Sequence, residues 1–175
     1  MMQGMKHNLT DLLKENHVIF MQDIHACLDF TLQAITVAKQ SYQNVLLGDF
    51  DRNTQERSLF LLMTEQNNLV FLKNFLSRNG IQLYSHGSRV PQNEFCVLAI
   101  SSDQWQDIPG YALDNVSVLF LFQDISSDHC HMLMQRFYWP RPQSQRPRIV
   151  AVSSNLCLSL PASKNDALTA MAEVW

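Results

Sequence analysis

Three short segments in the second half of the chain are apolar at almost every position: Phe95–Ser101, Val116–Phe122 and Ile149–Val152. A strand with one face in solvent alternates apolar and polar residues, whereas a strand covered on both faces is apolar throughout. Ile81–Ser85 indicates a further strand, and helical segments fit between the strands, notably His129–Tyr138. Alternating helices and buried strands predict a three-layer α/β domain, in which helices flank a mostly parallel sheet.

The first strand, turn and helix have the frame of a nucleotide-binding domain without its chemistry. Val18–Met21 predicts a strand, Ala26–Lys39 predicts a helix with an apolar stripe, and Gln22–His25 forms the turn between them. Nucleotide-binding α/β proteins keep a Gly-rich loop at such a turn, and its backbone N–H groups hold phosphate. This turn has no Gly and no Lys, and Asp23 would repel phosphate. We therefore expect a RecA-like or Rossmann-like fold without a phosphate loop, and no cofactor.

The middle of the chain is less regular. Asn44–Gly48 predicts a short buried strand that ends at an acidic, turn-rich run from Asp49. Thr54–Arg78 is apolar in two blocks, which predicts two consecutive helices or one broken helix. A strand at Leu59–Met63 is the alternative, because a continuous apolar run does not distinguish a buried strand from a buried helix. Asn79–Gly80 then indicates a helix end.

The composition is that of an ordinary globular chain of 175 residues, 46% apolar and 17% charged, which predicts a single domain over residues 1–175. A net charge of −3 favours neither nucleic acid nor an acidic membrane as a partner of the whole surface. No apolar run reaches the roughly 20 residues that span a bilayer, and Met1–Leu13 does not have the pattern of a signal peptide. The four cysteines are dispersed singly, which is typical of free thiols in a reducing cytosol, so we expect a cytoplasmic protein.

The acids after Asn44–Gly48 suggest a second interpretation, a phosphatase of the haloacid-dehalogenase type. Such enzymes place a nucleophilic Asp at a strand end and a second acid two residues later as the general acid and base, and further acids bind Mg²⁺. The residues that fit are Asp49, Asp51, Ser101, Asp124 and Asp128. Asn53 departs from the Thr or Val that the family prefers, and no Lys between Ser101 and Asp124 neutralises the phosphate. The phosphatase is therefore kept as the alternative to a chain without catalysis.

Two other patterns predict no chemistry. Asp128–His131 places metal-ligand types side by side, but adjacent residues on a helix point in different directions and no second cluster supplies matching ligands. We expect Asp128 to cap a helix and no metal to bind. A response-regulator receiver needs an acidic pair after its first strand and a Lys after its fifth. Here Asp23 is alone, and the late Lys164 lies well beyond a predicted strand end.

The segment Arg136–Arg148 has the strongest binding character. It contains four arginines, no acid, three adjacent aromatic residues and three prolines. Arg with aromatic residues contacts phosphate and stacks on bases, and Pro-rich spacing suits polyproline recognition, so a protein contact, a nucleic-acid contact and a stiff connecting loop all fit. We expect the guanidinium groups in solvent, so that replacing the last three arginines by Ala leaves folding intact. The candidate binding residues are Arg136, Trp139, Arg141, Arg146 and Arg148.

Phe95–Ser101 followed by Gln104–Pro109 resembles a stretch in the N-terminal region of BcsE-type regulators of bacterial cellulose secretion, and Leu32–Asp51 is similar in its order of helix, strand and acidic turn. The resemblance covers Ala26–Phe122. It implies a degenerate RecA-like domain that is catalytically silent and makes protein contacts. The cyclic-dinucleotide site of that family lies in another domain, with an Arg-x-Gly-Asp motif that has no match here. No ligand or site residue is therefore carried over.

These observations favour a cytoplasmic regulatory or assembly module without catalysis, which acts through contacts with a protein partner or with itself. The apolar segment Asp166–Trp175, predicted as a helix, either docks on the sheet of its own chain or contacts a partner. Nucleic acid is the other candidate partner, and no membrane span is expected.

Overall fold

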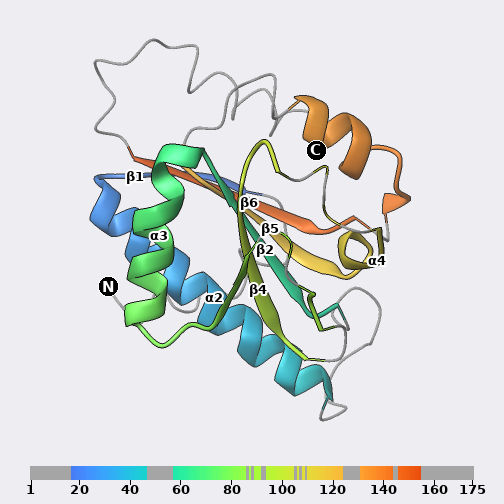
Figure 1. Ribbon diagram of the computed structural model, residues 1–175, viewed down its shortest axis with the longest axis horizontal. Coiled ribbons are helices and arrows are strands. Elements are labelled where there is room, and N and C mark those ends of the chain that lie inside the picture. The colour runs from blue at the N-terminus through green and yellow to red at the C-terminus, as the bar shows by residue number, and fades with distance from the viewer. Residues whose placement is uncertain are drawn as a thin grey trace.

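The computed structural model describes residues 17–46, 57–85, 87, 89–91, 94–104, 106, 108, 110–123, 131–143 and 146–154. The elements follow in the order β1 (His17–Met21), α2 (Ile24–Leu46), β2 (Leu59–Thr64), α3 (Gln66–Arg78), β3 (Leu83–Ser85), β4 (Cys96–Ser101), α4 (Gly110–Leu113), β5 (Val116–Phe122), the π-helical turn η3 (Met134–Tyr138) and β6 (Arg148–Ser154). The six strands form one sheet in the order β1-β6-β5-β2-β4-β3, and every pairing is parallel (Figure 1). The predicted α/β class with a parallel sheet is confirmed.

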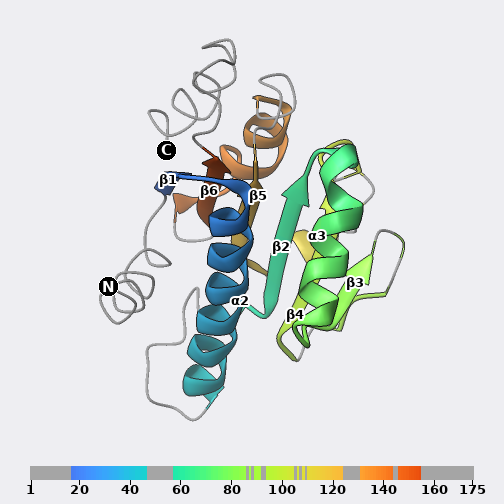
Figure 2. The same cartoon turned by 90° about the vertical axis from the view of Figure 1, so that its left-hand side faces the viewer.

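Helical segments lie on both faces of the sheet, so the central strands are buried on both sides. Along β2, Leu59, Leu61 and Met63 belong to one core, together with residues of α4 and η3. Phe60 and Leu62 belong to the opposite core, which α2 and α3 cover. Figure 2 shows these two helices along the same face of the sheet. The continuous apolar runs arise because successive residues of a strand enter two different cores.

α2 confirms the helix predicted after β1 and extends it to Leu46. The apolar stripe continues beyond Ala38 to Tyr42, one helical turn later, and both side chains are buried. The strand predicted at Asn44–Gly48 is therefore wrong, because residues 44–46 form the last turn of α2. A short apolar run does not by itself show which period it follows. The predicted stripe residues that pack on the sheet are Cys27, Leu28, Ala34, Ile35 and Ala38.

The segment predicted as two helices contains one strand and one helix. The strand alternative at Leu59–Met63 is confirmed by β2, which pairs with both β4 and β5, and the two-helix prediction is wrong. One residue, Glu65, separates β2 from α3. Gly80, with a φ of +83°, follows the helix as expected. Glycine adopts this left-handed conformation without the steric cost that a Cβ imposes.

The chain changes direction across the sheet between β2 and β5. After β2 it passes through α3, on the face of Phe60, towards β3. After β5 it passes through η3, on the face of Leu59, towards β6 on the other side of the sheet. The connections of these neighbouring strands therefore separate, and open α/β sheets bind their ligands at the carboxyl ends of strands at such a switch point.

Several predictions fall on residues outside the described ranges: Asp49, Asp51, Asp124, Asp128 and the segment Asp166–Trp175. In the part of the chain that the structure describes, no helix combines the length and the hydrophobicity that a membrane crossing requires. Cys27 and Cys96 are buried and not in a disulfide bond, as the dispersed cysteines predicted.

Candidate functional site

Buried polar side chains gather at the carboxyl end of the sheet, where the switch point lies. Thr64 ends β2, Ser101 ends β4 and Ser154 ends β6, and each is at most 7% exposed. Ser102 and Ser153 are buried beside them. A buried polar group costs free energy unless it is hydrogen-bonded, so the partners of these groups determine what this end of the sheet can do.

Thr64 bridges the strands on either side of the switch point. Its Oγ1 donates to the carbonyl oxygen of Phe122 at 2.9 Å, which joins the ends of β2 and β5. Its own carbonyl oxygen accepts from the N–H of Ser102 at 2.8 Å, which joins β2 to the turn after β4. Both polar groups of Thr64 that face this end of the sheet are therefore bonded to protein.

Gln123, directly after β5, ties that strand to β6. Its φ of +62° lies in the left-handed region, which costs a residue with a Cβ about 1–2 kcal/mol. Its N–H donates to Val152 O at 2.7 Å, and its Oε1 accepts from the N–H of Ser154 at 3.1 Å. These two bonds offset the strain, and they fix a strained residue next to the switch point.

The turn from β2 to α3 occupies the place where a strand–turn–helix unit at a switch point would hold phosphate. This turn consists of Glu65, the N-cap residue of α3. Its Oε2 accepts from Ser102 Oγ at 3.3 Å. The positive end of a helix dipole stabilises such a carboxylate, and the carboxylate repels a second anion at the same point.

The strand and the helix predicted on either side of Gln22–His25 are confirmed by β1 and α2, although the turn is shorter because α2 begins at Ile24. β1 lies at one end of the strand order and pairs with β6, so its turn is not at the switch point. Asp23 instead caps α2, where its Oδ1 accepts from the N–H of Ala26 at 2.9 Å. The turn at Glu65 also has no Gly and carries an acid.

Ser101 is the phosphatase candidate that lies within the described residues. It ends β4, as predicted, and its hydroxyl donates to Asp103. The phosphatase interpretation also placed Asp49 directly after a strand, but residues 44–46 are helical. Tyr42, in the same part of α2, contacts Phe95 just before β4 begins, with ring centroids 6.3 Å apart. This end of α2 therefore lies at the amino end of the sheet, opposite Ser101.

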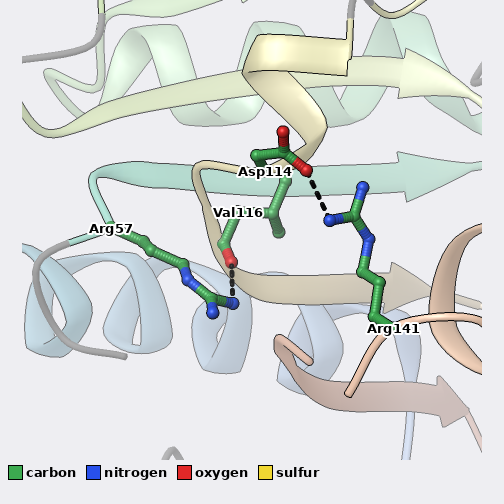
Figure 3. A network of polar contacts seen from close by, with 4 residues as sticks. All are labelled: Arg57, Asp114, Val116 and Arg141. Carbon is green, nitrogen blue, oxygen red and sulfur yellow. Dashed lines mark hydrogen bonds and ion pairs between the residues drawn. The ribbon is translucent and has the colours of Figure 1, made fainter. Parts of the chain in front are cut away.

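A second group of polar side chains lies at the amino end of the sheet. Arg57 precedes β2, and its Nη1 donates to the carbonyl oxygen of Val116 at 3.5 Å. Arg141, in the loop before β6, forms an ion pair with Asp114. The two guanidinium groups thus approach the start of β5 from two different segments of the chain (Figure 3).

Arg148 adds a third guanidinium group to this end of the sheet. It is the first residue of β6 and pairs in register with Val118 of β5. Burial lowers the pKa of Arg57. The charges of Arg141 and Arg148 lower this pKa further, and the carboxylate of Asp114 raises it. These charges therefore act on one another, and we call Arg57, Arg141 and Arg148 the amino-end arginine cluster.

Arg146 has a structural role rather than a place in solvent. Its Nε donates to the carbonyl oxygens of Tyr138, at 3.2 Å, and Arg141, at 3.0 Å. Its Nη2 donates to Trp139 O at 3.1 Å. The guanidinium carbon also lies 4.7 Å from the centroid of the Tyr138 ring. The prediction that its guanidinium group lies in solvent is wrong, because this group is bonded to three carbonyl oxygens of the chain. The side chain of Arg146 thereby holds together the turn that carries Arg141.

The aromatic residues of the same segment pack inward. Tyr138 is buried, at 4% exposed, in the core beneath η3. Trp139 is half-buried against that core, and its ring centroid lies 5.9 Å from that of His131 in an edge-on contact. Arg136 and Phe137 lie in η3, but their side chains are outside the description. The described aromatic rings are therefore part of the fold and do not form an open stacking surface.

Arg57 and Asp114 are functional candidates that the sequence analysis did not single out. Both lie just before strands, outside the arginine-rich segment, and nothing in their local sequence marks them. One available signal is that the amino ends of neighbouring parallel strands meet at one edge of a sheet, as Leu59 and Val116 do. Using it requires the strand order, which the sequence did not supply.

Comparisons with known proteins do not assign a family. No family model matches the chain, and no curated protein matches its sequence.

Among the residues that the structure describes, no three His, Cys, Asp or Glu side chains form a group that could hold a metal ion. Large exposed apolar side chains in the described ranges are Phe20, Val70 and Tyr111, each on a different element. Single exposed apolar residues are normal on a protein surface.

Proposed function

We propose that this chain is a non-catalytic regulatory or assembly module, which acts through protein contacts on a RecA-like scaffold without a phosphate loop. The observation that carries the proposal is Glu65 at the start of α3, at the switch point of the sheet. A carboxylate beside the N-terminus of α3 repels the phosphate that a nucleotide would place at the same point.

The bonding around Glu65 supports the same proposal. The hydroxyl of Thr64 is engaged by Phe122 O, and that of Ser102 lies within bonding distance of Glu65. A catalytic site at this end of the sheet would need polar groups aimed at a substrate, whereas these groups join one strand to the next. A module that works by contact in the cytoplasm, with a protein partner or a second copy, needs no such site.

Thermal unfolding with nucleotide tests this proposal. A nucleotide present at 100 times its Kd would stabilise the folded state by about 2.7 kcal/mol, which is a rise in Tm of about 5–10 °C for a chain of this size. We expect ATP and GTP at millimolar concentration, with and without Mg²⁺, to leave Tm unchanged. A rise of several degrees would contradict the proposal.

Phosphatase activity is the competing outcome. We expect no Mg²⁺-dependent hydrolysis of p-nitrophenyl phosphate above that of a mock preparation. If hydrolysis is found, Asp49→Asn decides its origin, because the nucleophilic carboxylate is removed while size is kept. Activity that is present in the wild type and lost in Asp49→Asn would replace our proposal with the phosphatase.

A further inference from the structure

We propose that the amino-end arginine cluster binds an acidic peptide segment of a partner protein. This inference rests on the proposed function, because it names the chemistry of a partner for a module that acts through protein contacts. Carboxylates are the matching ligands, since a planar guanidinium group binds them through two parallel N–H donors.

The placement of the three arginines follows from the parallel register. Leu59 of β2 lies opposite Val116 of β5, and Arg57 is two residues before Leu59. Arg148 begins β6 opposite Val118 of β5. Neighbouring strands lie about 4.8 Å apart, so arginines at the amino ends of β2 and β6 lie on either side of the start of β5. Arg141, in the loop before β6, pairs with Asp114, two residues before Val116.

The loop that presents Arg141 is held in place before any partner arrives. Arg146 binds the carbonyl oxygens of Tyr138, Trp139 and Arg141, and it lies over the ring of Tyr138. A long side chain and a loop normally lose conformational freedom on binding, which weakens association. Here much of that entropy is lost on folding, so the site is preorganised.

Asp114 indicates the kind of ligand that the cluster accepts. Its carboxylate pairs with Arg141, and its side chain is 68% exposed. This carboxylate also raises the pKa of Arg57, whereas Arg141 and Arg148 lower it. Asp114 therefore occupies, from within the chain, a position that a partner carboxylate can share or take over.

The packing of the aromatic residues favours a peptide over nucleic acid. Sequence-tolerant binding of single strands uses aromatic rings on which bases stack. Tyr138 is buried beneath Arg146, and Trp139 packs partly on the core and contacts His131 edge-on, so the described rings do not form a row of open faces. A net charge of −3 on the whole chain also opposes the approach of a long polyanion, whereas a short acidic segment is repelled less.

Fluorescence anisotropy with a labelled hexaglutamate peptide at low salt tests the site. We expect saturable binding to the whole chain that weakens as salt rises. Arg141→Gln and Arg148→Gln should each weaken binding about tenfold, which corresponds to about 1.4 kcal/mol. Arg78→Gln is the matched control, because Arg78 is an exposed arginine in the last turn of α3; it should bind like the wild type.

Asp114→Asn supplies the opposite prediction, since it removes the internal carboxylate and should tighten peptide binding several-fold. If the cluster had a purely structural role, Asp114→Asn would not raise the affinity for the peptide. The proposal is overturned if hexaglutamate does not bind at millimolar concentration, if the Arg78 variant loses as much affinity as the cluster variants, or if a labelled single-stranded or duplex DNA binds more tightly than the peptide. Each of these results leaves the nucleotide and hydrolysis tests unaffected, so failure of this inference is distinguishable from failure of the proposed function.

Discussion

The side-chain amide of Asn115 binds Ser58 at two points. Asn115 Oδ1 accepts from the N–H of Ser58 at 3.2 Å, and Asn115 Nδ2 donates to Ser58 Oγ at 2.7 Å. The backbone extends the contact, because Leu59 N–H donates to Asn115 O at 3.1 Å. The register between β2 and β5 shifts immediately afterwards, between Leu59 and Phe60. Asn115 therefore fixes the start of the central strand beside an irregular pairing.

Asn115→Ala should lower the free energy of unfolding by about 1–3 kcal/mol, because it leaves the buried polar groups of Ser58 without this partner. Urea unfolding followed by circular dichroism measures the loss. The control is Asn74→Ala, which removes an exposed amide from the middle of α3 and should change stability little. Equal effects of the two substitutions would mean that the contact with Ser58 contributes nothing to stability.

Gln123 should be a position where Gly is better than Ala. Both substitutions remove the bond from Gln123 Oε1 to the N–H of Ser154, but only Ala keeps the strain of a φ of +62°. We expect Gln123→Gly to be more stable than Gln123→Ala by about 0.5–1 kcal/mol, after the entropy cost of Gly is subtracted. At Asn74, in a right-handed helix, the same comparison should favour Ala by about 1 kcal/mol. Ala equal to or better than Gly at position 123 would contradict the left-handed backbone.

Replacing Arg146 should lower the stability of the fold more than replacing Arg141. Arg146→Ala should cost about 1.5–3 kcal/mol of unfolding free energy, because charged hydrogen bonds to carbonyl oxygens are lost. Arg141→Ala removes one ion pair, with the largely exposed carboxylate of Asp114, and a pair open to solvent is typically worth about 0–1 kcal/mol. Urea unfolding of both variants gives the comparison. If the two losses are the same, Arg146 does not organise the loop. The triple replacement of Arg141, Arg146 and Arg148 would not distinguish these roles.

Cys96 should make stability depend on pH in the alkaline range. Burial raises the pKa of its thiol to about 11, and Glu94 adds to the rise. The thiol of an unfolded chain has a pKa of about 8.5. The folded state thus favours the neutral thiol. The free energy of unfolding that this preference contributes is fully present below the unfolded pKa and is lost as pH rises towards 11. Urea midpoints measured from pH 8 to 10.5 should fall more steeply in the wild type than in Cys96→Ala. Parallel curves would exclude the shift.

Local sequence was sufficient for three of the strands, β4, β5 and β6, and for the first helix. β4, β5 and residues 149–152 of β6 are apolar at nearly every position, which is the pattern of strands covered on both faces. The stripe along α2 follows the helical period over several turns, and Gly80 marks the end of α3 through its own backbone freedom. The α/β class followed from these elements, because alternating helices and buried strands have few other ways to cover their apolar faces.

Tertiary structure alone decided the regions where two periods fit the same residues. Asn44–Gly48 and Leu59–Met63 are both short apolar runs, yet the first begins as the last turn of α2 and the second becomes the central strand β2. The difference lies in what surrounds each run, because β2 gains hydrogen bonds from a strand on either side. Strand order also set the candidate sites, by placing β1 at an edge, Glu65 at the switch point, and both Arg57 and Arg141 near the start of β5. Such contacts join residues far apart in the chain, and no local pattern carries them, because their free energy exists only once the sheet has formed.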